Sequence, residues 1–227
     1  MTVQRQRIHS RLPMLALVLC LIGLMASEAQ ATPTRHTWVR ATPLGVSETS
    51  YFYLLMERRN PGSYYNYTET LLLVRRDIRN GRLQERIKLR ETDFSADADD
   101  VWSQTERPTA GIDLGKYLRQ HSVQTAFPIQ LSADWKVEKN QLVMVAQGKS
   151  KVLVGKEVMA QPLAELVPEF GEPTGDHEFQ IGAAFESHGL KGLKTPPGTL
   201  VIIESGSAEY ESNFCQHVVF VPDSVLR

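Results

Sequence analysis

Two stretches of alternating apolar and polar residues flank Asn80-Gly81, and this pattern constrains the fold more than any other in the chain. Asn-Gly is the dipeptide favoured by a two-residue type I′ turn, because both central residues need a positive φ. The sequence therefore predicts a β-hairpin that joins Thr70–Ile78 to Arg82–Arg90. A two-residue turn fixes the register and sets Val74 opposite Ile87 on an apolar face.

The other face of this hairpin carries six cations in the predicted register. Arg75 then faces Arg86, and like charges directly opposite each other destabilise a sheet. An anionic partner, or the acidic stretch Glu91–Asp113 folding back, would offset that repulsion. The alternative is a solvated face whose charges resist edge-to-edge pairing. We expect a binding site for an anionic envelope component or an acidic protein, made of Arg75, Arg79, Arg82, Arg86, Lys88 and Arg90.

Strand and turn signals elsewhere predict a mainly β fold of antiparallel meanders and hairpins, sandwich- or barrel-like, with one or two short helices. Apolar periodicity predicts a helix at Ile112–His121, and Asp100–Thr105 is expected to form a turn. The expected strands are Tyr51–Arg58 before the first hairpin, Gln141–Ala146 with Lys151–Gly155 around the turn Gln147–Ser150, and Thr199–Glu204 with Phe214–Val221.

The N-terminus has the three parts of a secretory signal peptide. Arginines precede the apolar run Met14–Ala26, and the run is followed by Ala29-Gln30-Ala31. The run is shorter than the roughly 20 residues that a membrane-spanning helix needs. We therefore expect residues 1–31 to be cleaved, with no transmembrane segment left. A single mostly β domain, residues 32–227, would be exported to the periplasm or secreted, with a weak boundary near residues 122–135.

The chain has two cysteines, and cleavage would leave only Cys215, so no internal disulfide is expected. Cys215 and His217 lie two apart on a predicted strand and face the same way. A thiolate–imidazole pair suits nucleophilic catalysis, but a buried, inert cysteine is the commoner arrangement. His177 and His188, in glycine-rich surroundings, are further candidates for acid–base chemistry.

No motif in the chain predicts a cofactor or a metal site. The acidic group Asp93, Asp97, Asp99 and Asp100 has calcium-type ligands without the spacing of an EF-hand loop. There is no G-x-S-x-G and no nucleotide-binding motif after a strand. The formal net charge of −1 gives no reason to expect nucleic acid as a partner.

These features favour a non-enzymatic binding or interaction protein of the cell envelope or extracellular space, with an anionic partner. Its site would be the basic hairpin face or an apolar cleft between sheets. The alternative is a small exported hydrolase that uses His177, His188 or His217 with nearby carboxylates. Convergence of these histidines in space would separate the two hypotheses.

Overall fold

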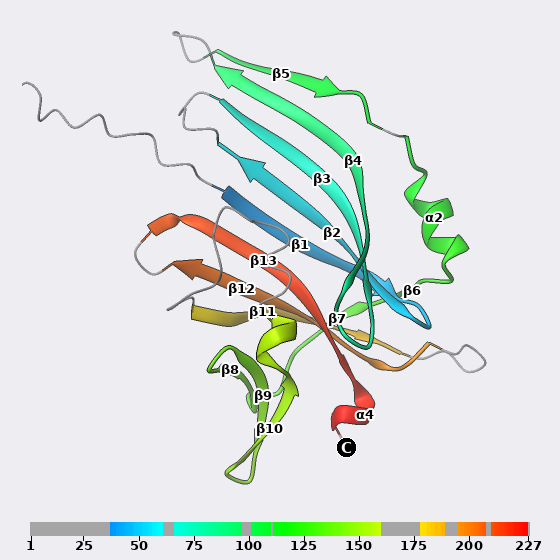
Figure 1. The fold of residues 1–227 in the computed structure, drawn as a ribbon, viewed down its shortest axis with the longest axis vertical. Coiled ribbons are helices and arrows are strands. Elements are labelled where there is room, and N and C mark those ends of the chain that lie inside the picture. The colour runs from blue at the N-terminus through cyan, green and yellow to red at the C-terminus, as the bar shows by residue number, and fades with distance from the viewer. Residues whose placement is uncertain are drawn as a thin grey trace, which may run out of the picture. The chain divides into compact units, whose positions relative to one another are not determined.

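A ten-stranded sheet and a three-stranded sheet form the framework of the described part of the chain (Figure 1). The computed structural model describes residues 37–60, 66–96, 101–109, 111–159, 178–188, 195–207 and 210–226. They belong to one compact unit, Arg35–Arg227. The predicted signal peptide, residues 1–31, lies outside the described residues.

The large sheet has the order β5-β4-β3-β2-β1-β13-β12-β11-β7, with β6 paired to β1. One pair, β1 with β13, is parallel, and the other pairs of described strands are antiparallel, which confirms the expected mainly β, antiparallel class. Its strands are β1 (Thr37–Val46), β2 (Ser50–Arg59), β3 (Asn66–Asp77), β4 (Leu83–Ala96), β5 (Trp102–Arg107), β6 (Gln124–Thr125), β7 (Phe127–Ile129), β11 (Glu178–Ser187), β12 (Gly198–Ser207) and β13 (Tyr210–Pro222).

The meander β2-β3-β4 is confirmed, but the predicted register of its hairpin is wrong by one residue. Val74 lies opposite Arg86, Leu73 opposite Ile87, and Arg75 opposite Glu85. The turn is longer than two residues: the Asp77 N–H donates to the Arg82 carbonyl and the Gly81 N–H to the Asp77 carbonyl, both at 2.9 Å. Only Gly81 in this turn has a positive φ, of 71°, so the turn is not type I′.

This one-residue shift changes which side chains share a face. Val74 is fully buried on the face that β2 lines with Tyr53 and Leu55, and Arg86 lies on that same face, here called the core face. Arg75 lies on the opposite face, beside Phe52 and the helix α2 (Leu114–Gln120), here called the helix face. The six cations therefore do not share one face, contrary to the prediction.

Two-residue turns with positive φ do occur, in the small sheet β10-β9-β8. Gln147-Gly148, with φ of 52° and 74°, joins β9 (Gln141–Ala146) to β10 (Lys149–Val154). This hairpin is confirmed, with a tighter turn than predicted. Lys139-Asn140, with φ of 50° and 60°, joins β9 to the unpredicted strand β8 (Trp135–Glu138).

Strands β1, β6, β7 and β11 have no counterpart among the predicted elements, and the other predictions mostly hold. The β12–β13 pair is confirmed, with strands longer than expected. Helix α2 is confirmed and starts at Asp113, whose side chain accepts a hydrogen bond from the Lys116 N–H at 2.9 Å. The turn expected at Asp100–Thr105 is wrong where the structure describes it, because strand β5 begins at Trp102. None of the described helices is both long and apolar enough to cross a membrane.

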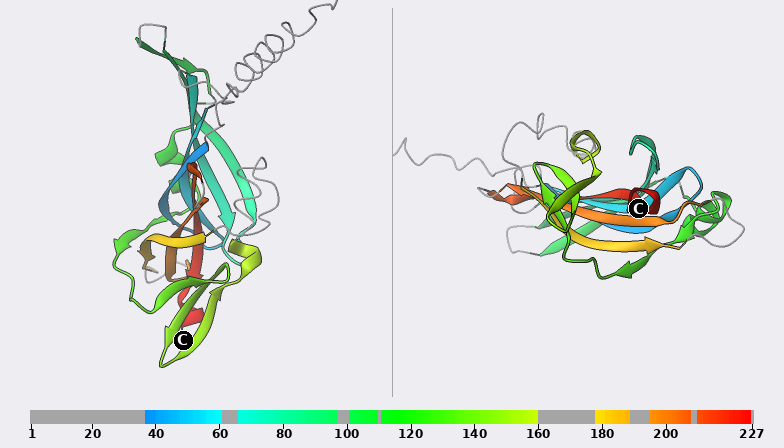
Figure 2. Two further views of the ribbon diagram at one scale, coloured as in Figure 1. Left: turned by 90° about the vertical axis from the view of Figure 1, so that its left-hand side faces the viewer. Right: turned by 90° about the horizontal axis from the view of Figure 1, so that it is seen from below.

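Both sheets contribute to a single apolar core. Val39 and Leu55 from the large sheet belong to the same buried cluster as Leu142 and Val154 from the small sheet. Figure 2 shows β8–β10 beside the β11–β13 half of the large sheet, and residue contacts join β10 to β13 and β8 to β11. A helical turn at residues 156–159 and the helix α4 (Asp223–Leu226) complete this end of the unit.

Candidate functional site

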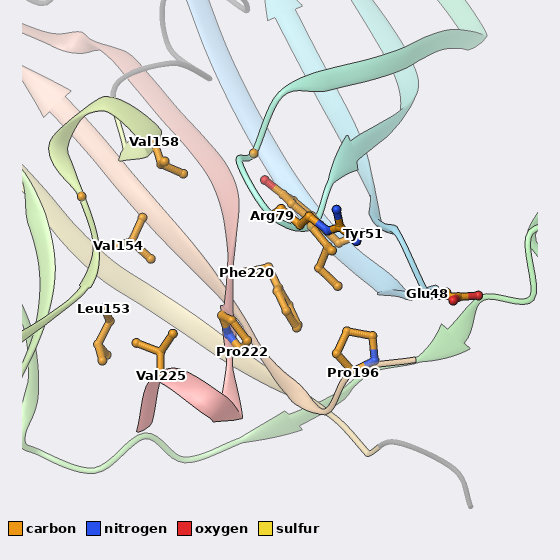
Figure 3. Close-up of a pocket in the computed structure, with 13 residues that line it drawn as sticks. Glu48, Tyr51, Arg79, Leu153, Val154, Val158, Pro196, Phe220, Pro222 and Val225 are labelled. Atoms are coloured by element: carbon orange, nitrogen blue, oxygen red, sulfur yellow. The ribbon is translucent and has the colours of Figure 1, made fainter. Parts of the chain in front are cut away.

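A cavity of about 520 Å³ opens where the small sheet, the β3–β4 turn and the end of β13 meet (Figure 3). Its lining is both apolar and polar, and it is here called the apolar cavity after its aromatic and aliphatic walls. This volume is in the range of small-molecule binding sites. Segments far apart in the sequence build its walls. The lining side chains drawn and labelled in Figure 3 are Glu48, Tyr51, Arg79, Leu153, Val154, Val158, Pro196, Phe220, Pro222 and Val225.

Two aromatic rings form one wall of the apolar cavity. The ring of Tyr51 stacks near that of Phe220, with centroids 6.4 Å apart. The Tyr51 hydroxyl donates a hydrogen bond of 3.2 Å to the Val218 carbonyl, and only 1% of Tyr51 is exposed. A phenol held at both its ring and its hydroxyl loses little further freedom when a ligand binds, so this wall is preorganised.

Aliphatic side chains form the facing wall. Leu153 and Val154 come from the end of β10, Val158 from the helical turn that follows, and Val225 from α4. Gly81 of the β3–β4 turn lies against this wall, because a Cβ added there would be 3.0 Å from Cγ1 of Val158. The apolar walls favour a ligand with a hydrocarbon or aromatic body.

Two charged residues line the cavity beside these apolar walls. Arg79 lies in the β3–β4 turn, and its backbone N–H donates to Oδ1 of Asp77 at 2.8 Å. Glu48 lies between β1 and β2. Both are exposed residues, so their charged groups stand at the solvent side of the cavity. Arg79 is the one member of the predicted basic site that lines the cavity among the residues that the structure describes.

The other predicted cations lie apart from the cavity. Arg86 forms an ion pair with Glu57, and Lys88 forms one with Glu91, both on the core face. Arg75 forms a 3.5 Å ion pair with Glu85 on the helix face. Arg82 and Arg90 are exposed. Three of these cations, Arg75, Arg86 and Lys88, therefore already have carboxylate partners within the fold. Glu91 lies on the same strand as Lys88, three residues along, so this pair does not show the acidic stretch folding back.

The ion pair with Arg86 stabilises the carboxylate of Glu57, which is buried in the sheet. Glu57 is only 4% exposed, and desolvation raises the pKa of its side chain above the ordinary value. The positive charges of Arg86 and then Arg59 oppose that shift. Buried charges require such partners, because water no longer solvates them. This cluster is explained by the packing of the sheet and needs no ligand.

Cys215 and His217 face the same buried side of β13, as predicted, but their chemistry does not suit nucleophilic catalysis. Burial, with a smaller effect from the charge of Glu57, raises the pKa of the Cys215 thiol to about 12. Burial and then the charge of Arg76 lower the pKa of His217 to about 3. A protonated thiol beside a neutral imidazole is a weak nucleophile. His217 instead packs edge-on against Phe179, with ring centroids 6.2 Å apart.

The histidines of the hydrolase hypothesis do not converge where they are described. His217 lies opposite Ile203, which pairs with Ile181 of β11, whereas His188 follows the far end of β11. The spacing along a strand puts them about 20 Å apart. His188 is exposed and lies 3.6 Å from Glu186. His177 lies outside the described residues.

The acidic candidates form no metal site in the part of the chain that the structure describes. Asp93 pairs with Arg107 and accepts a 2.8 Å hydrogen bond from Thr68, and these bonds lower its pKa. Asp97, Asp99 and Asp100 fall outside that part. Within it, no group of three or more histidine, cysteine or acidic side chains is arranged to hold a metal ion.

Comparison with known proteins gives no relative: no protein family, no curated protein and no solved structure matches the chain. A functional assignment must therefore start from the geometry of the described residues.

Sequence reasoning named an apolar cleft between sheets but not its residues. Tyr51 and Phe220 lie in strands whose apolar side chains point to both faces of the sheet. The alternation of apolar and polar residues therefore could not distinguish side chains that line the cavity from side chains of the core. The dipeptide Pro196-Pro197 indicates a loop and nothing more specific. The charged, glycine-containing turn Arg79-Asn80-Gly81 was the available signal, because loops on a rigid scaffold often carry binding residues.

Proposed function

We propose that this chain is an exported, non-enzymatic binding protein of the cell envelope or extracellular space, and that its ligand combines an apolar body with an anionic group. The observation that supports this most directly is the apolar cavity with Arg79 beside it. A hydrocarbon body would displace water from the walls around Tyr51 and Val158, which is favourable in proportion to the apolar area covered. Arg79 would bind the anionic group with charge-assisted hydrogen bonds.

The proposed location follows from residues 1–31, whose basic, apolar and Ala-x-Ala parts are those of a signal peptide. The two sheets share one core, and we infer a sandwich-like arrangement with the cavity at one end of the interface. Ligand cavities at the ends of such packed sheets use a rigid scaffold to hold loop residues in place.

Two amphiphiles with the same chain test this proposal by isothermal titration calorimetry: dodecanoate and dodecyltrimethylammonium, both below their micellar concentrations. We expect the full chain to bind dodecanoate more tightly than the cation. Arg79→Gln should weaken dodecanoate binding about tenfold, the effect of losing one charge-assisted contact. Its effect on the cation should be small or opposite, because an attractive group for the anion is a repulsive one for the cation.

Two further variants separate the cavity from the surface. Arg82→Gln removes an exposed cation from the same turn that does not line the cavity, and it should leave both affinities unchanged. Val158→Trp should fill the cavity and abolish binding of both amphiphiles. Unchanged binding by Val158→Trp, or no dodecanoate binding by the unmodified chain, would contradict the proposal.

A further inference from the structure

A second hollow, here called the polar cleft, lies beside the apolar cavity and has the opposite chemistry. It encloses about 740 Å³ on the helix face, between the β1–β2 turn and the end of α2. Glu48 lines both hollows, so the two adjoin at this residue. Five hydroxyl side chains line the polar cleft: Ser47, Thr49, Ser50, Ser122 and Thr195.

Internal hydrogen bonds hold the floor of the polar cleft in place. The Ser50 N–H donates to Oγ of Ser47 at 3.2 Å, and the Ser50 hydroxyl donates to Oε1 of Gln84 at 2.6 Å. The Gln84 amide nitrogen in turn donates to Oδ2 of Asp77 at 3.3 Å. These bonds orient the Gln84 amide without a ligand, so binding would cost little ordering of this side.

The opposite side is built around Arg75 and His121. Nη1 of Arg75 lies 3.3 Å from both ring nitrogens of His121. The imidazole packs between the rings of Phe52 and Tyr117, with centroid distances of 5.7 and 4.5 Å. Nε of Arg75 is buried and has no hydrogen-bond partner among the residues that the structure describes.

The charges of the polar cleft do not favour an anion. Glu85 balances Arg75 at 3.5 Å, and Glu48 adds a carboxylate for which no ion pair is found among the described residues. A second negative charge placed here would be repelled. Hydroxyl, amide and carboxylate side chains instead offer donors and acceptors in mixture, which complements a ligand whose groups also do both.

We propose that the polar cleft is a saccharide-binding site. Each sugar hydroxyl both donates and accepts a hydrogen bond, so it can donate to Glu48 and accept from Gln120 or a serine hydroxyl of the lining. The volume is ample for one or two sugar rings. The polar cleft adjoins the apolar cavity at Glu48 but does not include Arg79, and the saccharide is bound whether or not Arg79 binds an anionic group.

Saturation-transfer difference NMR on the full chain tests this with three neutral probes: maltose, cellobiose and N,N′-diacetylchitobiose. At least one probe should bind saturably at concentrations up to about 10 mM, the range of weak single-site recognition. The double variant Thr49→Val/Gln120→Ala removes a hydroxyl and an amide from the lining and should weaken that binding tenfold or more. Arg119→Ala, an exposed change in α2 outside the lining, is the matched control and should leave it unchanged.

Three outcomes would overturn the proposal. None of the probes binds; or the double variant binds as tightly as Arg119→Ala; or putrescine binds where no saccharide does, which would assign the cleft to cations. Dodecanoate titrated into the double variant should behave as with the unmodified chain. That control keeps a failure of the polar cleft distinct from a failure of the apolar cavity, and it shows that the variant is folded.

Discussion

At the scale of single residues, the partner of Glu57 is the most sensitive point of the core face. The Arg86 guanidinium contacts a carboxylate whose side chain is only 5% exposed. Arg86→Asp would remove the larger of the two positive charges, Arg86 and Arg59, that compensate this carboxylate, and it would set a second carboxylate beside Glu57. We expect the free energy of unfolding to fall by about 3 kcal/mol, measured by urea denaturation, because a buried charge that loses its main partner is strongly destabilising. In the register that the sequence predicts, Arg86 lies on the face opposite the core, where this change would cost little.

A second change tests whether charge is the cause. Glu57→Gln in the Arg86→Asp background should restore much of the loss, because the buried group is then neutral. Arg82→Asp, at an exposed position with no ion pair to a carboxylate among the described residues, should stay within about 0.5 kcal/mol of the unmodified chain. Equal damage from Arg82→Asp and Arg86→Asp would contradict this account of Glu57.

His217 should make stability depend on pH. Its pKa is about 3 in the folded chain and about 6.5 in the unfolded chain, so the unfolded state binds the extra proton between these values. Stability should therefore fall as the pH drops from about 6.5 towards 3. His217→Phe removes the proton-binding group beside Phe179. The difference in urea midpoint between variant and unmodified chain should move in favour of the variant as the pH falls, and a pH-independent difference would contradict the assignment.

At the scale of elements, a turn glycine links the hairpin to the cavity. Gly81 has a φ of 71° and a Cβ there would meet Val158, whereas Gly148 has a φ of 74° with open space around it. Gly148→Ala should cost about 1 kcal/mol from backbone strain alone. Gly81→Ala should cost about 2 kcal/mol, since contact with Val158 adds to the strain. Thermal melting of both variants checks this. Equal losses of stability would show that the Val158 side chain moves aside at no cost.

The sequence predicted which strands pair better than it predicted how they pair. Alternation located β2, β3 and β4, because a strand repeats every two residues whatever its partner. The register depended on the turn, and the side chains of Asp77 and Asn80 accept backbone hydrogen bonds that favour a longer turn than Asn80-Gly81 alone suggests. Strand β5 was not predicted as a strand, because its residues are all exposed and show no alternation of apolar and polar side chains.

At the scale of the whole molecule, the two hollows depend on contacts that no local pattern contains. The apolar cavity joins Tyr51 to Phe220 and Val158, and the polar cleft joins Arg75 to Ser122 and Thr195. These contacts between distant residues follow from the strand order, above all from the parallel pairing of β1 with β13, which joins the two halves of the large sheet. A parallel pair so distant in sequence gives no turn signal, so the candidate sites could not be read from the sequence.

The central position of β1 leads to a prediction about the whole chain. β1 is hydrogen-bonded to β2 on one side and to β13 on the other, and it supplies the buried residues Val39, Ala41 and Val46. Removing residues 1–31, as signal cleavage would, leaves this strand intact, so residues 32–227 should give a β-type circular dichroism spectrum and melt cooperatively. Removing residues 1–46 would separate the two halves of the sheet and expose the apolar groups that β1 covers, at a cost larger than the stability of an ordinary domain. Residues 47–227 should therefore show no cooperative melting transition. A cooperative transition in residues 47–227 at the melting temperature of 32–227 would mean that β1 is not the strand that joins the sheet.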